Sequence, residues 1–374
     1  MTRLASAWHD LTEGHSLGYL WNDFKGEARS SVESTVTELP PGTLEKRGWR
    51  RYWAFARAMF FRLTPARRVL VLLAVVLILS YPGSGGDAAQ SASSGRLIAA
   101  ALSLLVVLAL EVADRVALKR DLEVARDIQN WLLPHSPPKI AGVDIAFATR
   151  PANTVAGDYY DVLPMPAAGT GAAVLFVVAD VAGKGIPAGL LMACFRSCLR
   201  TLAGTARALS DLIGPLHRSC CADSCEGRRF TTAFLAQYDS ATGSLYYVNA
   251  GHSPPLLRRS SGLLTELEAG GLPFGMFADA TYEAGQILVG PGDLLLVYTD
   301  GVVEAVNEAG DEYGLDRLRA FVRDGASSSA VLQQQLFDSI EAFSGKARQH
   351  DDITCLIVQF TGIEVVDGRS ESRT

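Results

Sequence analysis

Two uncharged apolar runs constrain the fold of this chain more than any other feature. Val69–Tyr81 and Leu97–Leu110 contain no charged residue, and the Gly/Ser-rich stretch Pro82–Arg96 separates them. Each run is shorter than the ~20 residues that usually cross a bilayer, although small neighbouring residues extend both towards the lower limit of ~17. The runs are therefore compatible with two membrane-spanning helices or with two buried core helices.

The charges around these runs favour the membrane. Arg67 and Arg68 precede the first run, Arg115, Lys119 and Arg120 follow the second, and the stretch between them has one Arg and one Asp. Because Lys and Arg gather on the cytoplasmic side of membrane proteins, this asymmetry predicts two transmembrane helices within residues 66–112 and a cytoplasmic location for both ends. We expect a multi-pass protein of the inner (cytoplasmic) membrane, in contact with lipids. A soluble protein with two core helices is the alternative.

The region before the hairpin, residues 1–65, is predicted to be an N-terminal cytoplasmic tail. Its end mixes Lys and Arg with Trp, Tyr and Phe from Lys46 onward. Cationic groups favour anionic lipid heads and aromatic rings favour the interface, so this segment is typical of a juxtamembrane anchor. A nucleic-acid-binding arm has a similar composition, but the apolar run that follows favours the anchor. The net charge of −6 over the whole chain argues against a general nucleic-acid binder.

Residues 113–136 form a predicted linker helix. One helical stripe with 4-3-4-3 spacing contains Leu118, Leu122, Ala125, Gln129 and Leu132. The stripe is compatible with a single helix that lies on its own domain. It is also compatible with a short parallel coiled coil that forms a homodimer, in which Gln129 is a polar core position. Proline residues from position 134 onward end the helix.

Residues 137–362 have the pattern of an α+β domain, and 363–374 are predicted to be a flexible tail. The expected strands are Val174–Ala179, Thr232–Tyr238, Leu245–Asn249, Asp293–Tyr298 and Thr354–Phe360. The expected helices are Ile186–Ala203, Leu209–Cys221, Leu315–Val322 and Ala330–Phe343. This order predicts mostly antiparallel sheets that pack face to face under helices.

Acidic residues recur beside small residues at the ends of predicted strands. AGDYYD carries Asp158 and Asp161, VVADVAGKG carries Asp180, LLLVYTDG carries Asp300, and QHDDITCLIV carries Asp351 and Asp352. A lone Asp-Gly pair is most often a surface turn. Several carboxylates at strand ends of one domain instead predict a shared cleft that binds hard divalent cations, which prefer oxygen ligands. Two such ions can activate water and stabilise charge on a phosphoryl group.

Several motifs together carry a resemblance to a known family. They are AGDYYD, VADVAGKGIPAGLLMA, TTAFLAQYDSATGSLYYVNAGHSPPLL, GGLPFGMF, PGDLLLVYTDGVVEAVN and HDDITCLIV, in this order. Over about residues 120–362 the sequence resembles the SpoIIE-like branch of the PPM (PP2C-like) metal-dependent protein serine/threonine phosphatases. The resemblance implies a β-sandwich of two mostly antiparallel sheets flanked by helices, with two Mn²⁺ or Mg²⁺ ions at its edge.

The resemblance also implies the metal ligands. Asp158 and Asp180 match the acids of the first two motifs and are expected to be catalytic, with Asp180 the better candidate to bridge both ions. Val181 stands where related phosphatases often have Gly, so only its backbone carbonyl is carried over as a ligand. Asp300 matches the Asp of the Thr-Asp-Gly motif, and Asp351 matches the first Asp of the final pair.

Four further residues are candidates for substrate or supporting roles. Lys184 is expected either to attract the phosphate or to be a solvated turn residue. His252, in the Asn-Ala-Gly-His turn, is expected either to donate a proton to the leaving oxygen or to shape the turn. Asp161 and Asp352 are expected to support the ligands. Ala156 departs from the family pattern, which commonly has Gly there.

The resemblance implies a function as well. We expect a membrane-anchored phosphatase that hydrolyses phosphoserine or phosphothreonine on a bacterial signalling protein, typically an anti-sigma-factor antagonist, through a metal-activated water. The alternative is a catalytically inactive membrane scaffold that binds a phosphoprotein partner. The four intact acids favour the enzyme.

Overall fold

The computed structural model describes residues 57, 60–61, 63–80, 87–166, 173–224, 229–268, 270–325 and 328–362, with the side chains of residues 87–94 left out. The predicted tails, 1–65 and 363–374, lie almost entirely outside these residues. The chain divides into two compact units, Met1–Ala117 and Leu118–Thr374.

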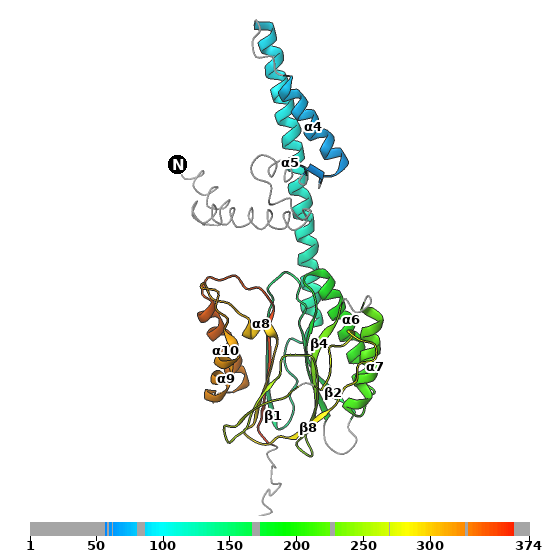
Figure 1. Ribbon diagram of the computed structural model, residues 1–374, viewed down its shortest axis with the longest axis vertical. Helices are drawn as coiled ribbons and strands as arrows, with labels where there is room; N and C mark the ends of the chain where they lie inside the picture. Colours follow the sequence, from blue (N-terminus) through cyan, green and yellow to red (C-terminus); the bar gives the residue numbers. More distant parts are fainter. Residues whose placement is uncertain are drawn as a thin grey trace, which may run out of the picture. The chain divides into compact units, whose positions relative to one another are not determined.

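The first unit contains helix α4 (Pro65–Leu79) and most of the length of helix α5 (Asp87–Leu132) (Figure 1). Pro65 opens α4, where a proline loses no helical hydrogen bond. Large apolar side chains lie exposed along both helices, including Leu79 at 79% and Ile98 at 61%. A continuous apolar surface of this kind marks an interaction with lipid or with another protein.

The helices of the first unit differ from the predicted hairpin in length. Helix α5 begins at Asp87, so the predicted loop Pro82–Arg96 is largely helical, and α5 contains both the second apolar run and the predicted linker helix. Helix α4 has 15 residues, fewer than a bilayer usually requires. Among the described helices, the part of α5 from Gly95 and helix α6 (Ile186–Ala203) are long and apolar enough to span a membrane. Helix α6 packs on a sheet and is a core helix.

The second unit is a sandwich of two five-stranded sheets (Figure 1). The β1 sheet has the order β1 (Val143–Arg150), β10 (Ile353–Phe360), β9 (Leu294–Tyr298), β6 (Leu256–Arg258) and β7 (Leu264–Glu266). The β2 sheet has the order β2 (Tyr159–Met165), β3 (Ala173–Val181), β4 (Thr231–Asp239), β5 (Ser244–Ala250) and β8 (Gly285–Leu288). All neighbouring strands are antiparallel. The predicted α+β class is confirmed.

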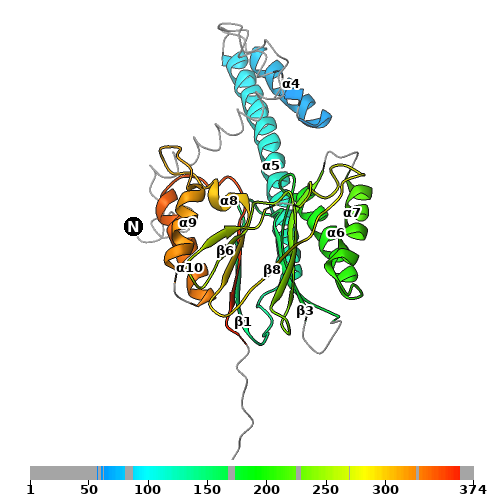
Figure 2. The same cartoon turned by 60° about the horizontal axis from the view of Figure 1, so that its bottom comes forward.

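Helices cover the outer face of each sheet (Figure 2). Helices α6 and α7 (Leu209–Asp223) pack on the β2 sheet, and α9 (Gly314–Asp324) and α10 (Ser329–Ser344) pack on the β1 sheet. Because successive side chains of a strand point to opposite faces, β10 contributes to two cores. Leu356 and Val358 lie in the core between the sheets, whereas Cys355 and Ile357 lie in the core under α9 and α10.

Candidate active site

Acidic residues meet at one end of the sandwich. Strand β2 begins and β3 ends there, and because the two strands are antiparallel, Asp158 and Asp180 come together at the edge of the β2 sheet. Strand β9 ends and β10 begins at the same end, which brings Asp300 and Asp351 together in the β1 sheet. Asp300 also opens the short helix α8 (Asp300–Val303).

Gly157 allows the two acids of the β2 sheet to approach each other. A Cβ atom at this position would lie 2.9 Å from the Val181 carbonyl oxygen and 3.2 Å from Oδ1 of Asp180. The first distance is shorter than side chains tolerate, so the close approach requires a residue without Cβ. The Val181 carbonyl therefore lies beside the loop that carries Asp158, as its predicted role as a ligand requires.

Gly301 makes the corresponding close approach in the β1 sheet. A Cβ atom there would overlap the carbonyl oxygen of Asp352. Gly301 is buried and follows Asp300 directly, so the turn that carries Asp300 packs against the backbone of the Asp351–Asp352 pair. Gly157 and Gly301, each beside an acid at a strand end, thus have a packing reason as well as a turn propensity.

Thr299 connects the two sheets. Its hydroxyl donates a hydrogen bond to Oδ2 of Asp158 at 2.9 Å and accepts one from the backbone amide of Thr354 at 3.1 Å. Thr299 and Asp158 are both buried. A fully paired threonine at this point fixes the β2-sheet acids relative to the β1-sheet acids.

The acids raise one another's pKa values. Burial raises the pKa of Asp158 well above its usual value, and the neighbouring carboxylate of Asp180 raises it further. Burial followed by the charges of Asp300 and Asp351 raises the pKa of Asp180 to about 7. The pKa of Asp300 is raised by burial and then by Asp351. Clustered carboxylates that are costly to ionise are stabilised by a bound cation.

The two acids of the final pair, Asp351 and Asp352, have different partners. Asp352 accepts hydrogen bonds from the backbone amides of Ala152 and Gly157, both at 2.8 Å, so its two oxygens hold the loop ahead of Asp158. Asp351 accepts a hydrogen bond from the Asp352 amide through Oδ1, and its Oδ2 lies 2.8 Å from Nζ of Lys184. Asp351 therefore faces the open side of the site, and Asp352 supports it.

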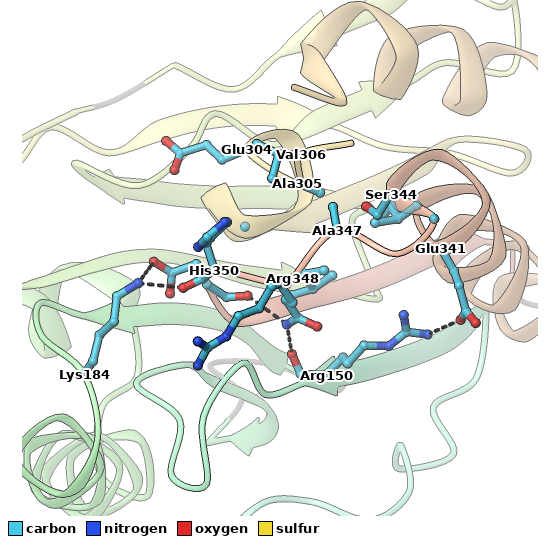
Figure 3. Close-up of a pocket in the computed structure, with 16 residues that line it drawn as sticks. Arg150, Lys184, Glu304, Ala305, Val306, Glu341, Ser344, Ala347, Arg348 and His350 are labelled. Carbon is cyan, nitrogen blue, oxygen red and sulfur yellow. Dashed lines mark hydrogen bonds and ion pairs between the residues drawn. The ribbon is translucent and has the colours of Figure 1, made fainter. Parts of the chain in front are cut away.

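Lys184 lies at the edge of an open cleft of about 570 Å³ that begins at Asp351 (Figure 3). Its ammonium group donates hydrogen bonds to Asp351 and to the carbonyl of His350, at 2.8 and 2.7 Å. The hydrogen bond to Asp351 raises the pKa of Lys184, which keeps the lysine charged. The cleft also contains Glu304 and Arg348.

His252 is a buried part of the turn that follows β5. Its amide donates to the Asn249 side chain at 2.7 Å, the Asn249 amide group donates to the His252 carbonyl at 2.9 Å, and Gly251 between them has a φ of 67°. Burial lowers the pKa of His252 to about 4, so the imidazole is neutral at pH 7. The geometry favours the turn-shaping role of this histidine over proton donation.

Asp161 is buried in strand β2, three residues after Asp158. It pairs with Arg200 of α6, at 2.7 Å to Nε, and accepts a hydrogen bond from the hydroxyl of Tyr159 at 2.5 Å. These partners attach α6 to strand β2. Both carboxylate oxygens of Asp161 accept hydrogen bonds from Arg200, and the residue is buried, so it has a structural role.

Gln129 has a role that the sequence did not indicate. Its side chain forms two hydrogen bonds with the backbone of Ala156, one to the carbonyl at 2.8 Å and one from the amide at 2.9 Å. Gln129 is buried within the second unit and therefore supports the loop that carries Asp158. A polar residue in an otherwise apolar helical stripe was the only sequence signal. This contact agrees with the expectation of a helix that lies on its own domain.

The donor set is compatible with hard divalent ions, since it consists of carboxylates and one carbonyl oxygen. Within the described part of the chain, no three His, Cys, Asp or Glu side chains form a group that could hold a metal ion. The ammonium group of Lys184 lies 2.8 Å from Oδ2 of Asp351. Binding of a cation by Asp351 therefore competes with Lys184.

Comparison with known proteins gives the same family that the motifs suggest. The model of the Stage II sporulation protein E (SpoIIE) family matches residues 170–361, which is half of the chain. The chain belongs to the SpoIIE family. Its fold is that of the SpoIIE-like, PP2C-type phosphatases, and the predicted family is confirmed.

Individual relatives are similar over the same region. IcfG of Synechocystis sp. is 28% identical over 282 residues, which cover 67% of this chain and 43% of IcfG. The phosphoserine phosphatase RsbU of Bacillus subtilis is 27% identical over 65% of this chain and 70% of RsbU. The structure of the SiaA-PP2C domain of Pseudomonas aeruginosa superposes with a TM-score of 0.57 at 21% identity, over 66% of this chain and 99% of that domain. This likeness confirms the sandwich fold.

Proposed function

We propose that this chain is a membrane-anchored, metal-dependent protein phosphatase that hydrolyses phosphoserine or phosphothreonine on a bacterial signalling protein. The observation that carries the proposal is the meeting of four aspartates from two sheets at one end of the sandwich, beside an open cleft that Asp351 lines. Membership of the SpoIIE family and similarity to a phosphoserine phosphatase support it.

Asp158, Asp180, Asp300, Asp351 and the Val181 carbonyl are proposed to hold two Mn²⁺ or Mg²⁺ ions. Bound there, the ions would activate water for in-line attack and neutralise charge on the phosphoryl group. The raised pKa values of Asp158 and Asp180 support this proposal, because a cation favours their ionised forms.

Other residues position the substrate in this proposal. Lys184 lies beside Asp351 and can move its ammonium group from the carboxylate to an incoming phosphate. Gly157 and Thr299 hold the acids, and Asp352 holds the preceding loop. His252 is buried and neutral at pH 7, so protonation of the leaving serine oxygen falls to solvent in the open cleft.

The proposed substrate is a phosphorylated protein of the anti-sigma-factor-antagonist kind. The resemblance to SpoIIE-like phosphatases supports this class of substrate. The cleft supports a protein substrate, because it is open and lined by charged residues from β1, α10 and the segment before β10 rather than enclosed around a small molecule.

The proposed location is the inner membrane, with the phosphatase domain in the cytoplasm. The exposed apolar side chains of α4 and α5 support membrane association. Fractionation of cells that express the full chain tests it, and recovery in the soluble fraction contradicts it.

A homodimer through α5 is also proposed. Val124, Ile128 and Trp131 follow a 4-3 spacing and are exposed at 52%, 54% and 78%. This stripe is distinct from the one that contains Gln129, and a second copy of the helix would bury it. The double substitution Val124→Lys and Ile128→Lys is expected to convert the detergent-solubilised chain from dimer to monomer in analytical ultracentrifugation. An unchanged mass contradicts the dimer.

The activity is tested with the full chain, Mn²⁺ and two substrates, p-nitrophenyl phosphate and a phosphoserine peptide. The wild type is expected to hydrolyse both, and Asp180→Ala is expected to hydrolyse neither. Asp279→Ala is the control, because Asp279 is exposed and lies outside the cleft. A wild type no faster than Asp180→Ala favours the inactive scaffold.

A further inference from the structure

Arg348 lines the cleft from the loop between helix α10 and the acid pair Asp351–Asp352. We propose that its guanidinium group forms an anion subsite that binds an acidic side chain of the substrate protein, two or three residues from the phosphorylated residue. The inference rests on the proposed phosphatase function and assigns the feature of the substrate that the cleft selects.

The loop that carries Arg348 is held at both ends. The amide of Lys346 donates a hydrogen bond to Glu308 at 3.0 Å. The side chain of Gln349 donates to the carbonyls of Arg150 and Asp351, at 2.7 and 2.8 Å. The backbone on either side of Arg348 is therefore fixed, and its side chain lines the cleft. A fixed backbone lowers the entropic cost of binding through this residue.

The other cations of the cleft already have partners. Lys184 pairs with Asp351 at 2.8 Å, and Arg150 pairs with Glu341 at 3.1 Å and lies over the ring of Phe337. Arg348 makes no hydrogen bond or ion pair with any residue that the structure describes. A charged guanidinium group without a partner, in a cleft that leads to a reaction centre, is suited to bind an anionic group of the substrate.

The position of Arg348 favours an acidic side chain over the reacting phosphate. Asp351 lies three positions after Arg348 in the sequence, and a chain of that length spans up to about 10 Å when it is extended. The phosphate must lie at the acids, where Lys184 is the nearest cation. An extended peptide that enters along the cleft covers the same distance with two or three residues. Figure 3 shows Arg348 on the loop between Lys184 and Arg150.

The distribution of charge in the cleft favours one orientation of the substrate peptide. Burial and then the charge of Asp300 raise the pKa of Glu304, which lines the cleft, so the α8 side of the cleft is acidic. Arg348 gives the opposite side an unpaired positive charge. A peptide with its acidic residue on the Arg348 side has complementary charge, whereas the reverse orientation places that acid beside Glu304. Charge pairs at such positions select between partners more than they add affinity.

The test compares two phosphoserine peptides, one with Glu and one with Gln at positions two and three on each side of the phosphoserine. Full-length protein in detergent with Mn²⁺ is expected to prefer the Glu peptide. In Arg348→Ala the ratio of kcat/KM for the Glu peptide over the Gln peptide is expected to fall about fivefold, through KM, as expected for one exposed ion pair. In Arg348→Glu the preference is expected to reverse.

Lys346→Ala is the matched control, since this lysine is an exposed cation of the same loop that does not line the cleft. It is expected to leave the ratio unchanged. An unchanged ratio in Arg348→Glu, or an equal loss on both peptides in Arg348→Ala, overturns the proposal. If the wild type hydrolyses neither peptide, the proposed function fails. The subsite is then judged by fluorescence anisotropy, where Arg348→Glu should weaken binding of the Glu peptide but not of the Gln peptide.

Discussion

The two halves of the acidic site differ in the burial of their carboxylates and in the positive charge that lies beside them. In the β2 sheet, Asp158 is 3% exposed, receives a hydrogen bond from Thr299, and lies beside Asp180 without a nearby cation of its own. In the β1 sheet, the side chain of Asp351 is 40% exposed and pairs with Lys184. Buried like charges are costly in a protein, whereas exposed pairs contribute little. The β2-sheet half therefore carries most of the electrostatic cost of the site.

The largest effect is expected for loss of the β2-sheet acids. Asp180→Asn is expected to lower phosphatase activity by about 10³-fold or more, because a bound cation supplies several kcal/mol of charge stabilisation. The same substitution is expected to raise the melting temperature of the metal-free protein, because it removes a buried charge. Activity and thermal unfolding are measured on the same samples. A lower melting temperature of the metal-free variant would contradict the electrostatic cost assigned to the buried carboxylate of Asp180.

The pH dependence of stability tests the same half. In the unfolded chain the pKa of Asp180 is near 3.8, and in the folded protein burial and neighbouring acids raise it to about 7. The folded state therefore binds a proton more tightly. Protonation of Asp180 therefore contributes up to about 4 kcal/mol to stability. This contribution is fully present below about pH 4 and is lost as the pH rises through 7.

Chelator-treated protein is expected to melt at a lower temperature at pH 8 than at pH 6, and Asp180→Asn should lessen this dependence. Excess Mn²⁺ should restore the melting temperature at pH 8. An identical pH dependence in wild type and variant would show that groups other than Asp180 cause the pH dependence of the melting temperature.

Substitutions at Gly157 and Gly301 compare how tightly the backbone packs in the two halves of the site. Gly301→Ala is expected to destabilise the protein by about 3 kcal/mol, because the new methyl group overlaps the Asp352 carbonyl. Gly157→Ala is expected to cost about 1 kcal/mol, since its contact with the Val181 carbonyl is 2.9 Å. Gly290→Ala, with no neighbour within 4 Å, is the control. Thermal unfolding measures the stability of all three variants. Equal losses of stability at Gly157 and Gly301 would contradict the tighter packing expected at Gly301.

The smallest effect is expected at Lys184. The pair with Asp351 is exposed on both sides, so it contributes at most about 1 kcal/mol. Lys184→Gln is expected to strengthen Mn²⁺ binding by up to about fivefold, because Asp351 loses a competing cation. Isothermal titration calorimetry measures the affinity. Weaker Mn²⁺ binding in the variant would show that Lys184 supports the metal-bound geometry instead of opposing it.

Much of the fold could be predicted because its central elements have strong local patterns. Helix α6 was predicted with its observed ends, and β3, β4, β5, β9 and β10 were predicted to within about two residues. Strands β1 and β2 were missed because Pro151 and polar residues interrupt the apolar pattern around them. The start of α5 was missed because the Gly and Ser residues before it favour loops.

The site divides in the same way. The placement of aspartates beside small residues at strand ends could be read from the sequence, because that pattern is local and the family motifs repeat it. Which acid of the final pair lines the cleft depends on the fold, because Asp351 contacts Lys184 whereas Asp352 accepts hydrogen bonds from the amides of Ala152 and Gly157. These partners are distant in sequence, as are Gln129 and Ala156. Packing of the two sheets alone brings them together.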